Sequence, residues 1–380
     1  MHKIPHMLMV FILFALLSTA LVPATAMAEE TQKDVKVTVE PQQTLEQVSK
    51  VNNLSFDKLK DILGKGTYTP ETTVQQMMDE KGVSLEQLTK KIYDLRLEVD
   101  LEGSKDWTKI MIKFILWAVF IILGMALLSK ASKKKPLYNK RKIFLIAASL
   151  IFGFWLGSDP NPVGTINDAL VLYGQKGYIF KPRMVALTIF LLTVVLGGRM
   201  LCGWGCQFGC LQEVFYQLPV RKYRLPFVVS QSLRVIFFIT ITALALGWGF
   251  NLIELFDPFK IFSLQPIVLW GTTVFVAVIL LLSIFIYRPW CQILCPFGLL
   301  AWLIEKISWF RIRVNHDTCV KCGLCQKVCP TGAMNGKHKG KSEIDCYNCS
   351  LCIDKCPVGA ISYSKSVVKT NVTEKQTTAL

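Results

Sequence analysis

Five apolar stretches follow one another between residues 110 and 286 and dominate the hydropathy pattern of the chain. They run over Ile110–Leu128, Ile143–Gly157, Met184–Gly198, Phe227–Phe250 and Pro266–Ile286. Uninterrupted apolar character of this kind predicts membrane-spanning helices, which need about 20 residues each. The second and third stretches are short, so flanking residues must lengthen them. The pattern therefore predicts an α-helical integral membrane bundle with five spans, within residues 106–312.

Charged residues divide the loops between these stretches into two kinds. The loop from Lys130 to Lys142 carries seven Lys or Arg, and later loops of the same parity carry further cations: Arg199, Arg221, Lys222, Arg224 and Arg288. The opposite loops, residues 158–181 and 251–265, have far fewer cations and contain four acidic residues: Asp159, Asp168, Glu254 and Asp257. By the positive-inside rule the first set is cytoplasmic. We therefore expect a multi-pass protein of the cytoplasmic membrane with its C-terminus inside.

The first 28 residues have the pattern of a secretory signal peptide. Lys3 precedes an apolar segment over residues 7–21, and Ala26-Met27-Ala28 supplies small residues for cleavage before Glu29. An uncleaved first helix is the alternative, and it leaves the topology of the rest of the chain unchanged. In both cases residues 29–105 are expected outside the cytoplasm.

Residues 29–105 are polar, lack cysteine and contain an internal repeat. Pro41, Thr44, Gln47, Ser55 and Leu59 recur at an offset of 29 as Pro70, Thr73, Gln76, Ser84 and Leu88. Each copy predicts two short helices, capped by Thr44 and Ser55 or by Thr73 and Ser84. The segment has no catalytic constellation. We interpret it as an exported helical module that serves as a docking or spacer domain.

Composition and cysteine usage narrow the class of protein further. Hydrophobic residues make up 52% of the 380 residues, which is high for a soluble enzyme. The net charge of +16 does not indicate a nucleic-acid partner, because the cations flank apolar stretches and no nucleic-acid module is present. Of thirteen cysteines, none lies between Ala28 and Leu201, and eight form two evenly spaced runs. This is ligand spacing and not a disulfide framework.

The two runs have the spacing of iron–sulfur ligands, C-x2-C-x2-C-x3-C-P, in which the fourth cysteine of each run binds the other cluster. We assign cluster 1 to Cys319, Cys322, Cys325 and Cys356, and cluster 2 to Cys346, Cys349, Cys352 and Cys329. Structural zinc would leave half of these thiols without a role. The runs resemble those of bacterial two-cluster ferredoxins. That resemblance predicts a pseudo-symmetric α+β domain with two [4Fe-4S] clusters over residues 313–363, before a polar tail over residues 364–380.

Five more cysteines lie at the cytoplasmic ends of two predicted spans. The first segment reads Arg199-x2-Cys202-x3-Cys206-x3-Cys210, and its echo reads Arg288-x2-Cys291-x3-Cys295-Pro296. If the first segment is one helix, cysteines four residues apart share a face and can meet Cys291 and Cys295. These thiols could hold a third cluster, exchange a disulfide or receive electrons. Simple packing in the bundle is the remaining alternative.

Several polar residues lie in or near the predicted spans and could have functional roles. Arg234 lies inside the fourth apolar stretch, where it either contacts a cluster or quinone or snorkels to the interface. The segment from Phe297 to Phe310 predicts an amphipathic helix on the inner membrane surface. The acidic candidates for proton transfer near a quinone all lie near predicted span ends: Glu213, Glu254, Asp257 and Glu305. The four histidines, His2, His6, His316 and His338, lie outside the predicted spans of the mature chain, so a bis-histidine haem is not expected.

Together, the signal-like N-terminus, the two Cys-x3-Cys segments and the two-cluster tail resemble the membrane polyferredoxins of the NapH and NosR type, over about residues 142–363. The resemblance implies a non-catalytic component that moves electrons between a cytoplasmic carrier or quinone pool and a membrane or exported redox partner, such as a reductase. A redox-dependent maturation or regulatory factor for an exported reductase is the alternative. Gln207 replaces the usual proline and Cys210 is additional. The exported module looks too short for a flavin-binding domain.

Overall fold

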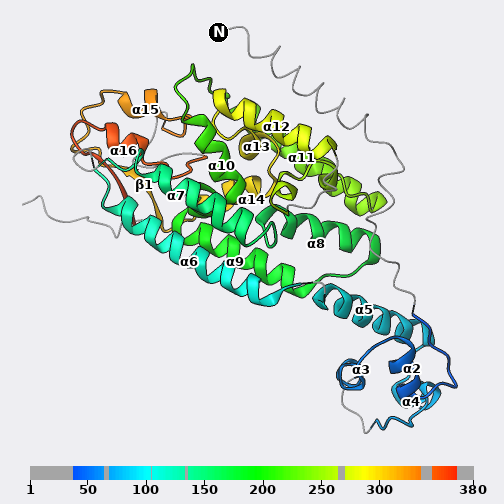
Figure 1. The fold of residues 1–380 in the computed structure, drawn as a ribbon. Helices are drawn as coiled ribbons and strands as arrows, with labels where there is room; N and C mark the ends of the chain where they lie inside the picture. Colours follow the sequence, from blue (N-terminus) through cyan, green and yellow to red (C-terminus); the bar gives the residue numbers. More distant parts are fainter. Residues whose placement is uncertain are drawn as a thin grey trace, which may run out of the picture. The chain divides into compact units, whose positions relative to one another are not determined.

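The computed structural model describes residues 37–63, 68–103, 105–132, 136–263, 270–334 and 345–365. The predicted signal peptide and nearly all of the predicted tail lie outside these residues. Within the described residues, the chain forms two compact units, residues 37–108 and residues 109–365. Figure 1 shows both as ribbons.

In its described residues the smaller unit contains four helices: α2 (Leu45–Val51), α3 (Phe56–Leu63), α4 (Val74–Lys81) and α5 (Leu85–Gly103). Thr44 and Thr73 each close a capping box, as the repeat predicts. The two copies also exchange backbone hydrogen bonds, because Leu45 N–H donates to Thr72 and Val74 N–H donates to Gln43. The apolar residues of both copies therefore share one core.

The larger unit is mostly helical. Its helices are α6 (Trp107–Ser129), α7 (Arg141–Ala148), η2 (Ser149–Trp155), α8 (Pro162–Lys176), α9 (Lys181–Gly197), η3 (Leu201–Gly205), α10 (Gln207–Tyr216), α11 (Phe227–Trp248), η4 (Ile253–Phe256), η5 (Pro258–Ser263), α12 (Trp270–Phe285), α13 (Pro289–Ile293) and α14 (Pro296–Glu305). Helix α8 packs on α9 and α11, α10 on α7 and α12, and α14 on α9 and α11. Helix α10 is therefore close to the centre of the unit (Figure 1).

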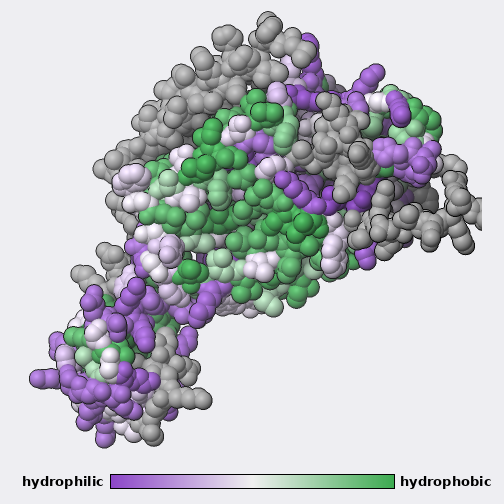
Figure 2. All heavy atoms as spheres, turned by 180° about the vertical axis from the view of Figure 1, so that it is seen from behind, coloured by the Kyte–Doolittle hydropathy of each residue, from purple (hydrophilic) through white to green (hydrophobic). Residues whose placement is uncertain are grey.

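Two helices of the described residues, α6 and α11, are long and apolar enough to cross a membrane. The helices at the other three predicted spans are shorter, so a five-span bundle remains a prediction. Figure 2 shows a broad apolar area on this unit. Exposed apolar side chains occur on several helices, including Ile122 on α6, Ile143 on α7, Trp155 on η2 and Val228 on α11.

Helix α8 occupies a segment that the apolar pattern treated only as a loop between spans. Asn161 caps its N-terminus by accepting hydrogen bonds from the N–H groups of Val163 and Gly164. Near the other end, Gly174 lies against α11 so closely that an added Cβ would be 1.8 Å from the carbonyl oxygen of Ala245. Residues 158–181 therefore contribute a packed helix to the unit.

The prediction of a surface helix from Phe297 to Phe310 is wrong. Helix α14 ends at Glu305, and Phe310 already belongs to a strand. One side of α14 is buried, including Phe297, Leu299 and Ala301, because the helix packs against α9 and α11. Leu303, Ile307 and Trp309 of the same segment are exposed, so the errors are the length of the helix and the placement of Glu305, which is buried, on a polar face.

The C-terminal region has the short, pseudo-symmetric elements expected of a ferredoxin-like domain. Strand β1 (Phe310–Val314) pairs antiparallel with β2 (Ile361–Lys365), and α15 (Leu324–Val328) packs on α16 (Leu351–Lys355). Lys321 and Asn348 occupy equivalent places in the two cysteine runs, and both have positive φ, 54° and 51°. The two runs therefore turn in the same way. We call residues 310–365 the ferredoxin-like region.

Candidate iron–sulfur centres

Two turns of similar design carry the cysteines outside the ferredoxin-like region. In the first, η3 holds Cys202, and the chain becomes extended at Cys206 before α10 begins. In the second, α13 holds Cys291, and the chain becomes extended at Cys295 before α14 begins. Residues 202–210 therefore do not form the single helix that would place Cys202, Cys206 and Cys210 on one face, because the backbone breaks at Cys206.

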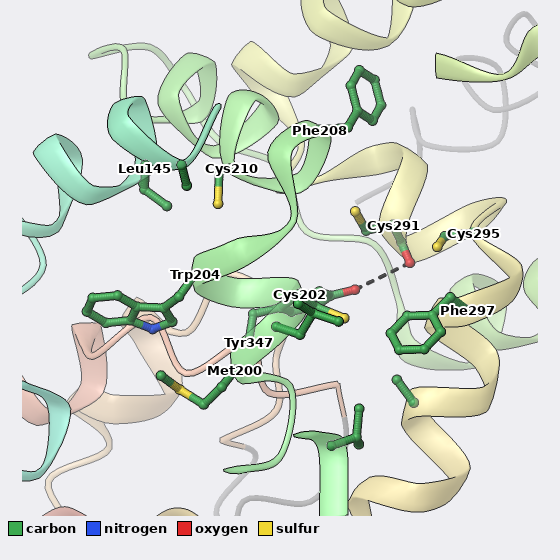
Figure 3. Packing of buried hydrophobic residues seen from close by; sticks show 14 of the residues in the cluster. Leu145, Met200, Cys202, Trp204, Phe208, Cys210, Cys291, Cys295, Phe297 and Tyr347 are labelled. Carbon is green, nitrogen blue, oxygen red and sulfur yellow. Dashed lines mark hydrogen bonds between the residues drawn. The ribbon is translucent and has the colours of Figure 1, made fainter. Parts of the chain in front are cut away.

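Four of the five cysteines nevertheless converge. Cys202, Cys206, Cys291 and Cys295 all line one cavity, and we call this set the four-cysteine site. The cavity has a volume of about 20 Å³, so the thiols surround unfilled space. Figure 3 shows Cys202, Cys291 and Cys295 close together, with Phe297 and Tyr347 beside them. The predicted meeting of the two segments is thus confirmed for these residues.

Cys210 does not belong to this set. It lies apart from the cavity, beside Leu145 in Figure 3. Its Sγ lies 3.9 Å from the carbonyl oxygen of Gly203, to which the thiol donates a weak hydrogen bond. Burial raises the pKa of the Cys210 thiol to about 12. A protonated thiol that packs and donates is therefore the state that this environment favours.

Hydrogen-bond donors surround the sulfurs of the four-cysteine site. Gly298 N–H donates to Cys295 Sγ at 3.3 Å, and the Gln212 amide donates to Cys291 Sγ at 3.5 Å. Trp290 also lines the cavity, and its buried indole N–H has no partner among the described residues. Such donors stabilise thiolate and sulfide, and an orphaned buried donor indicates an absent acceptor.

The donor set fits a [4Fe-4S] cluster, which four cysteine thiolates hold. Burial raises the pKa of Cys206 well above its ordinary value, and the nearby thiols of Cys291 and Cys202 raise it further. Four such thiols ionise together only when a metal centre takes the protons' place. Neither at this site nor elsewhere in the described residues do three His, Cys, Asp or Glu side chains lie close enough together to bind a single metal ion. A cubane spreads its ligands over four irons and needs no such convergence.

Two arginines cross between the turns. Arg199 precedes the first turn but donates to the carbonyl of Gly298 in the second, whereas Arg288 precedes the second but donates to the carbonyl of Cys202 in the first. Both are fully buried. Arg288 pairs with Glu213 at 2.5 Å. These contacts hold the two turns together and supply positive charge beside the thiols.

Arg234 does not snorkel to the interface. It is fully buried and donates to both carboxylate oxygens of Asp345 at 3.0 Å each. It also donates to the carbonyl oxygen of Gln292 at 3.0 Å. The snorkelling interpretation is therefore wrong, whereas a contact of Arg234 with a cluster or quinone stays a prediction. The carboxylate partner of Arg234 lies 111 residues away in the chain, directly before Cys346, and no local sequence signal indicates that contact.

The ferredoxin-like cysteines lie in two neighbourhoods. Burial raises the pKa of Cys352, and the thiols of Cys349, Cys346 and Cys329 lie close enough to raise it further. Thus Cys329 of the first run lies beside the cysteines of the second. Burial likewise raises the pKa of Cys325, on which Cys319 and Cys322 also act. Cys356 accepts the N–H of Ala360 at 3.3 Å.

Known protein families match both cysteine regions. The 4Fe-4S dicluster domain family matches residues 311–372. The 4Fe-4S binding domain family matches residues 182–226 and 268–315, which contain the four-cysteine site. With the geometry above, these matches show that the chain contains two regions of the 4Fe-4S binding type, one in the ferredoxin-like region and one around the four-cysteine site. No solved structure gives a significant match.

Relatives refine this class. YccM of Escherichia coli (strain K12) is 27% identical over 173 residues, which cover 42% of this chain and 48% of that protein. Regulatory protein NosR of Pseudomonas aeruginosa is 25% identical over 243 residues, 57% of this chain and 33% of NosR. Ferredoxin-type protein NapH of Haemophilus influenzae is 29% identical over 174 residues, 43% of this chain and 54% of NapH.

The chain is therefore a distant homologue of the ferredoxin-type 4Fe-4S proteins represented by NapH, NosR, NirI and YccM. The match covers about half of the length of YccM and less than two thirds of the other three. The resemblance inferred from the cysteine motifs is thus confirmed, and so is the presence of 4Fe-4S clusters.

Proposed function

We propose that this protein is a membrane-bound electron carrier with three [4Fe-4S] clusters. Clusters 1 and 2 occupy the ferredoxin-like region, with the ligands assigned from the two cysteine runs. The third is held by the four-cysteine site. The observation that carries the proposal is the convergence of Cys202, Cys206, Cys291 and Cys295, from two separate turns, on one cavity against the ferredoxin-like region. A packing role for these residues would not require unfilled space between the thiols.

We place the larger unit in the cytoplasmic membrane with five spans. Exposed apolar side chains on α6, α7, η2, α9, α11 and α12 support this placement, because a soluble protein rarely exposes so much contiguous apolar surface. The basic loops then face the cytoplasm, together with the ferredoxin-like region. Residues 29–105 form the exported module, and residues 106–312 form the membrane domain.

We propose that electrons pass between a cytoplasmic carrier or the quinone pool and a membrane or exported redox partner. An exported reductase that docks on the helical module is such a partner. A role in regulation or maturation is the second candidate, because one relative is named a regulatory protein. Deleting the gene for this protein distinguishes the electron-transfer role from the regulatory or maturation role. The first role leaves a fully metallated reductase without electrons, whereas the second leaves an immature or unexpressed reductase.

Anaerobic iron and sulfide analysis with EPR spectroscopy tests the three-cluster proposal. We expect about twelve irons per wild-type chain and about eight in a variant with serine at all four residues of the four-cysteine site. Cys210→Ser is the matched control, because this buried cysteine lies outside the cavity, and it should retain about twelve. About eight irons in all three proteins would refute the third cluster. Fewer than eight in intact wild-type protein would refute the two-cluster tail.

A further inference from the structure

One residue belongs to both of the proposed metal environments, and the inference drawn from it rests on the proposed function. Tyr347 directly follows Cys346, a proposed ligand of cluster 2, and also lines the cavity of the four-cysteine site. It is 3% exposed. The chain therefore runs from a proposed ligand of one site straight into the wall of the other.

The Tyr347 ring is held firmly in this wall. Its hydroxyl donates to the carbonyl oxygen of Cys291 at 3.3 Å. The guanidinium carbons of Arg199 and Arg288 lie 4.8 Å and 5.3 Å from the ring centroid. Cation–π contacts of this kind restrict where an aromatic ring can move. The ring therefore has a fixed place beside the four thiols.

The backbone around Tyr347 is fixed as well. A Cβ on Gly203, the residue after Cys202, would lie 2.1 Å from the carbonyl oxygen of Tyr347, so only glycine permits this approach. Trp204 donates its indole N–H to the carbonyl oxygen of Asn348 at 3.1 Å. Asn348 in turn donates its side-chain amide to the carbonyl oxygen of Gly197 at 3.0 Å. The segment of cluster 2 thus docks directly on η3.

The first cysteine run has a different environment. Cys319 and Cys325 are half-buried, as are Cys346 and Cys349 of the second run, but Cys322 is exposed. The ligands proposed for cluster 2 are all buried or half-buried, so cluster 1 has the one exposed ligand of the two described sets. Cluster 1 is therefore the one that a soluble carrier can approach. Cluster 2 is the one that adjoins the four-cysteine site through residues 346–349.

We propose that the three centres form a chain in the order cluster 1, cluster 2, four-cysteine site, and that the aromatic ring of Tyr347 couples the last two. In each transfer one electron leaves a reduced cluster and enters an oxidised one. No bond forms or breaks, and no proton is required. Tyr347 is a positioning and coupling residue, because it lines the cavity of the four-cysteine site and directly follows Cys346, a proposed ligand of cluster 2.

The test compares variants of the full-length, cluster-loaded protein in detergent. Dithionite is mixed with the oxidised protein, and rapid-freeze EPR follows the reduction of each centre. We expect Tyr347→Leu to slow reduction of the four-cysteine centre severalfold without slowing cluster 2, because the ring is lost. Tyr347→Phe keeps the ring and should react at the wild-type rate.

Tyr363→Phe is the matched control. Tyr363 is also a buried tyrosine of the ferredoxin-like region, and its hydroxyl donates to the carbonyl oxygen of Gly197 at 3.0 Å, but it does not line the cavity. It should leave every rate unchanged. Equal rates in Tyr347→Leu and wild type, with about twelve irons in both, would overturn the inference and leave the proposed function intact. About eight irons in wild type would overturn both.

A second measurement does not depend on the folding of Tyr347→Leu. In reduced wild-type protein, magnetic coupling to the four-cysteine centre should broaden the EPR signal of cluster 2 more than that of cluster 1. Serine at the four cysteines should remove that broadening. Stronger coupling to cluster 1 would contradict the proposed order.

Discussion

Among single residues, Asp345 is a buried carboxylate that balances the charge of two buried arginines. Its carboxylate lies 2.6 Å from Arg199 and 3.0 Å from Arg234, and both guanidinium groups are fully buried. Buried cations are tolerated only when an anion is held beside them. Asp345 therefore links α11, which contains Arg234, to the segment between α9 and η3, which contains Arg199.

We expect Asp345→Asn to lower the free energy of unfolding by about 3–5 kcal/mol, because it leaves the buried Arg234 without a carboxylate and leaves Arg199 with Glu305 alone, at 3.4 Å. Chemical denaturation in detergent measures this. The exposed pair of Arg96 and Asp100, at 3.0 Å, gives the control, and Asp100→Asn should cost less than about 1 kcal/mol. Similar losses in the two variants would show that the buried pair has no special role.

Asp257 gives a prediction about pH. Burial raises its pKa to about 7, whereas an unfolded aspartate has a pKa of about 4. Between these values the folded protein holds a proton that the unfolded chain has released, so stability falls as pH rises through this window. Above about pH 7 the whole penalty is present.

We expect Asp257→Asn to unfold at a higher temperature than wild type at pH 8.5, with a gain of about 1–2 kcal/mol. The gain is moderate because Asp257 is only half-buried. Asparagine can keep the hydrogen bond that Phe259 N–H donates to the side chain at 3.0 Å. The difference should shrink as the pH is lowered toward 5. A gain that is independent of pH would contradict the role of ionisation.

At the scale of elements, local sequence patterns predicted the segments whose chemistry is local. The capping boxes at Thr44 and Thr73 need only residues three positions apart, and the cysteine runs need only their own spacing. The apolar stretches likewise predicted where α6 and α11 lie. Each of these signals is contained in one contiguous segment.

Elements and contacts that depend on distant partners were not predictable in this way. Helix α8 is stabilised by packing on α9 and α11, and one side of α14 is buried because α9 and α11 pack against it. The same holds within the site. The sequence did not indicate Asp345 as a site residue, because its role depends on the ion pair with Arg234, 111 residues away. The break at Cys206 was also missed, since cysteine at this spacing is equally compatible with a continuous helix.

A substitution at Gly174 tests whether α8 packs against α11. An added Cβ would lie 1.8 Å from the backbone oxygen of Ala245 in α11, and backbone cannot move aside as a side chain can. We expect Gly174→Ala to cost about 1–3 kcal/mol of stability. Gly247→Ala, on α11 itself, is the control, because nothing lies within 4 Å of its added methyl group. A loss in both variants, or in neither, would contradict the packing of α8 on α11.

For the whole molecule, the number of spans decides on which side of the membrane the clusters lie. Two spans, α6 and α11 alone, would return the chain to the side from which it started. Five spans would leave the exported module and the ferredoxin-like region on opposite sides. The loop over residues 130–142, with its seven cations, favours a cytoplasmic position after the first span.

Reporter fusions distinguish an odd from an even number of spans. We expect alkaline phosphatase to be active when inserted at Asn53 in the module or at Gly177 after α8, because both sites are exported in the five-span arrangement. Green fluorescent protein fused after Leu380 should fluoresce, since it folds in the cytoplasm. If α6 and α11 alone span the membrane, Gly177 follows a single span, so phosphatase there would be inactive and the C-terminal reporter dark. That pair of results would move the ferredoxin-like region to the exported side and rule out a cytoplasmic carrier as the partner of cluster 1.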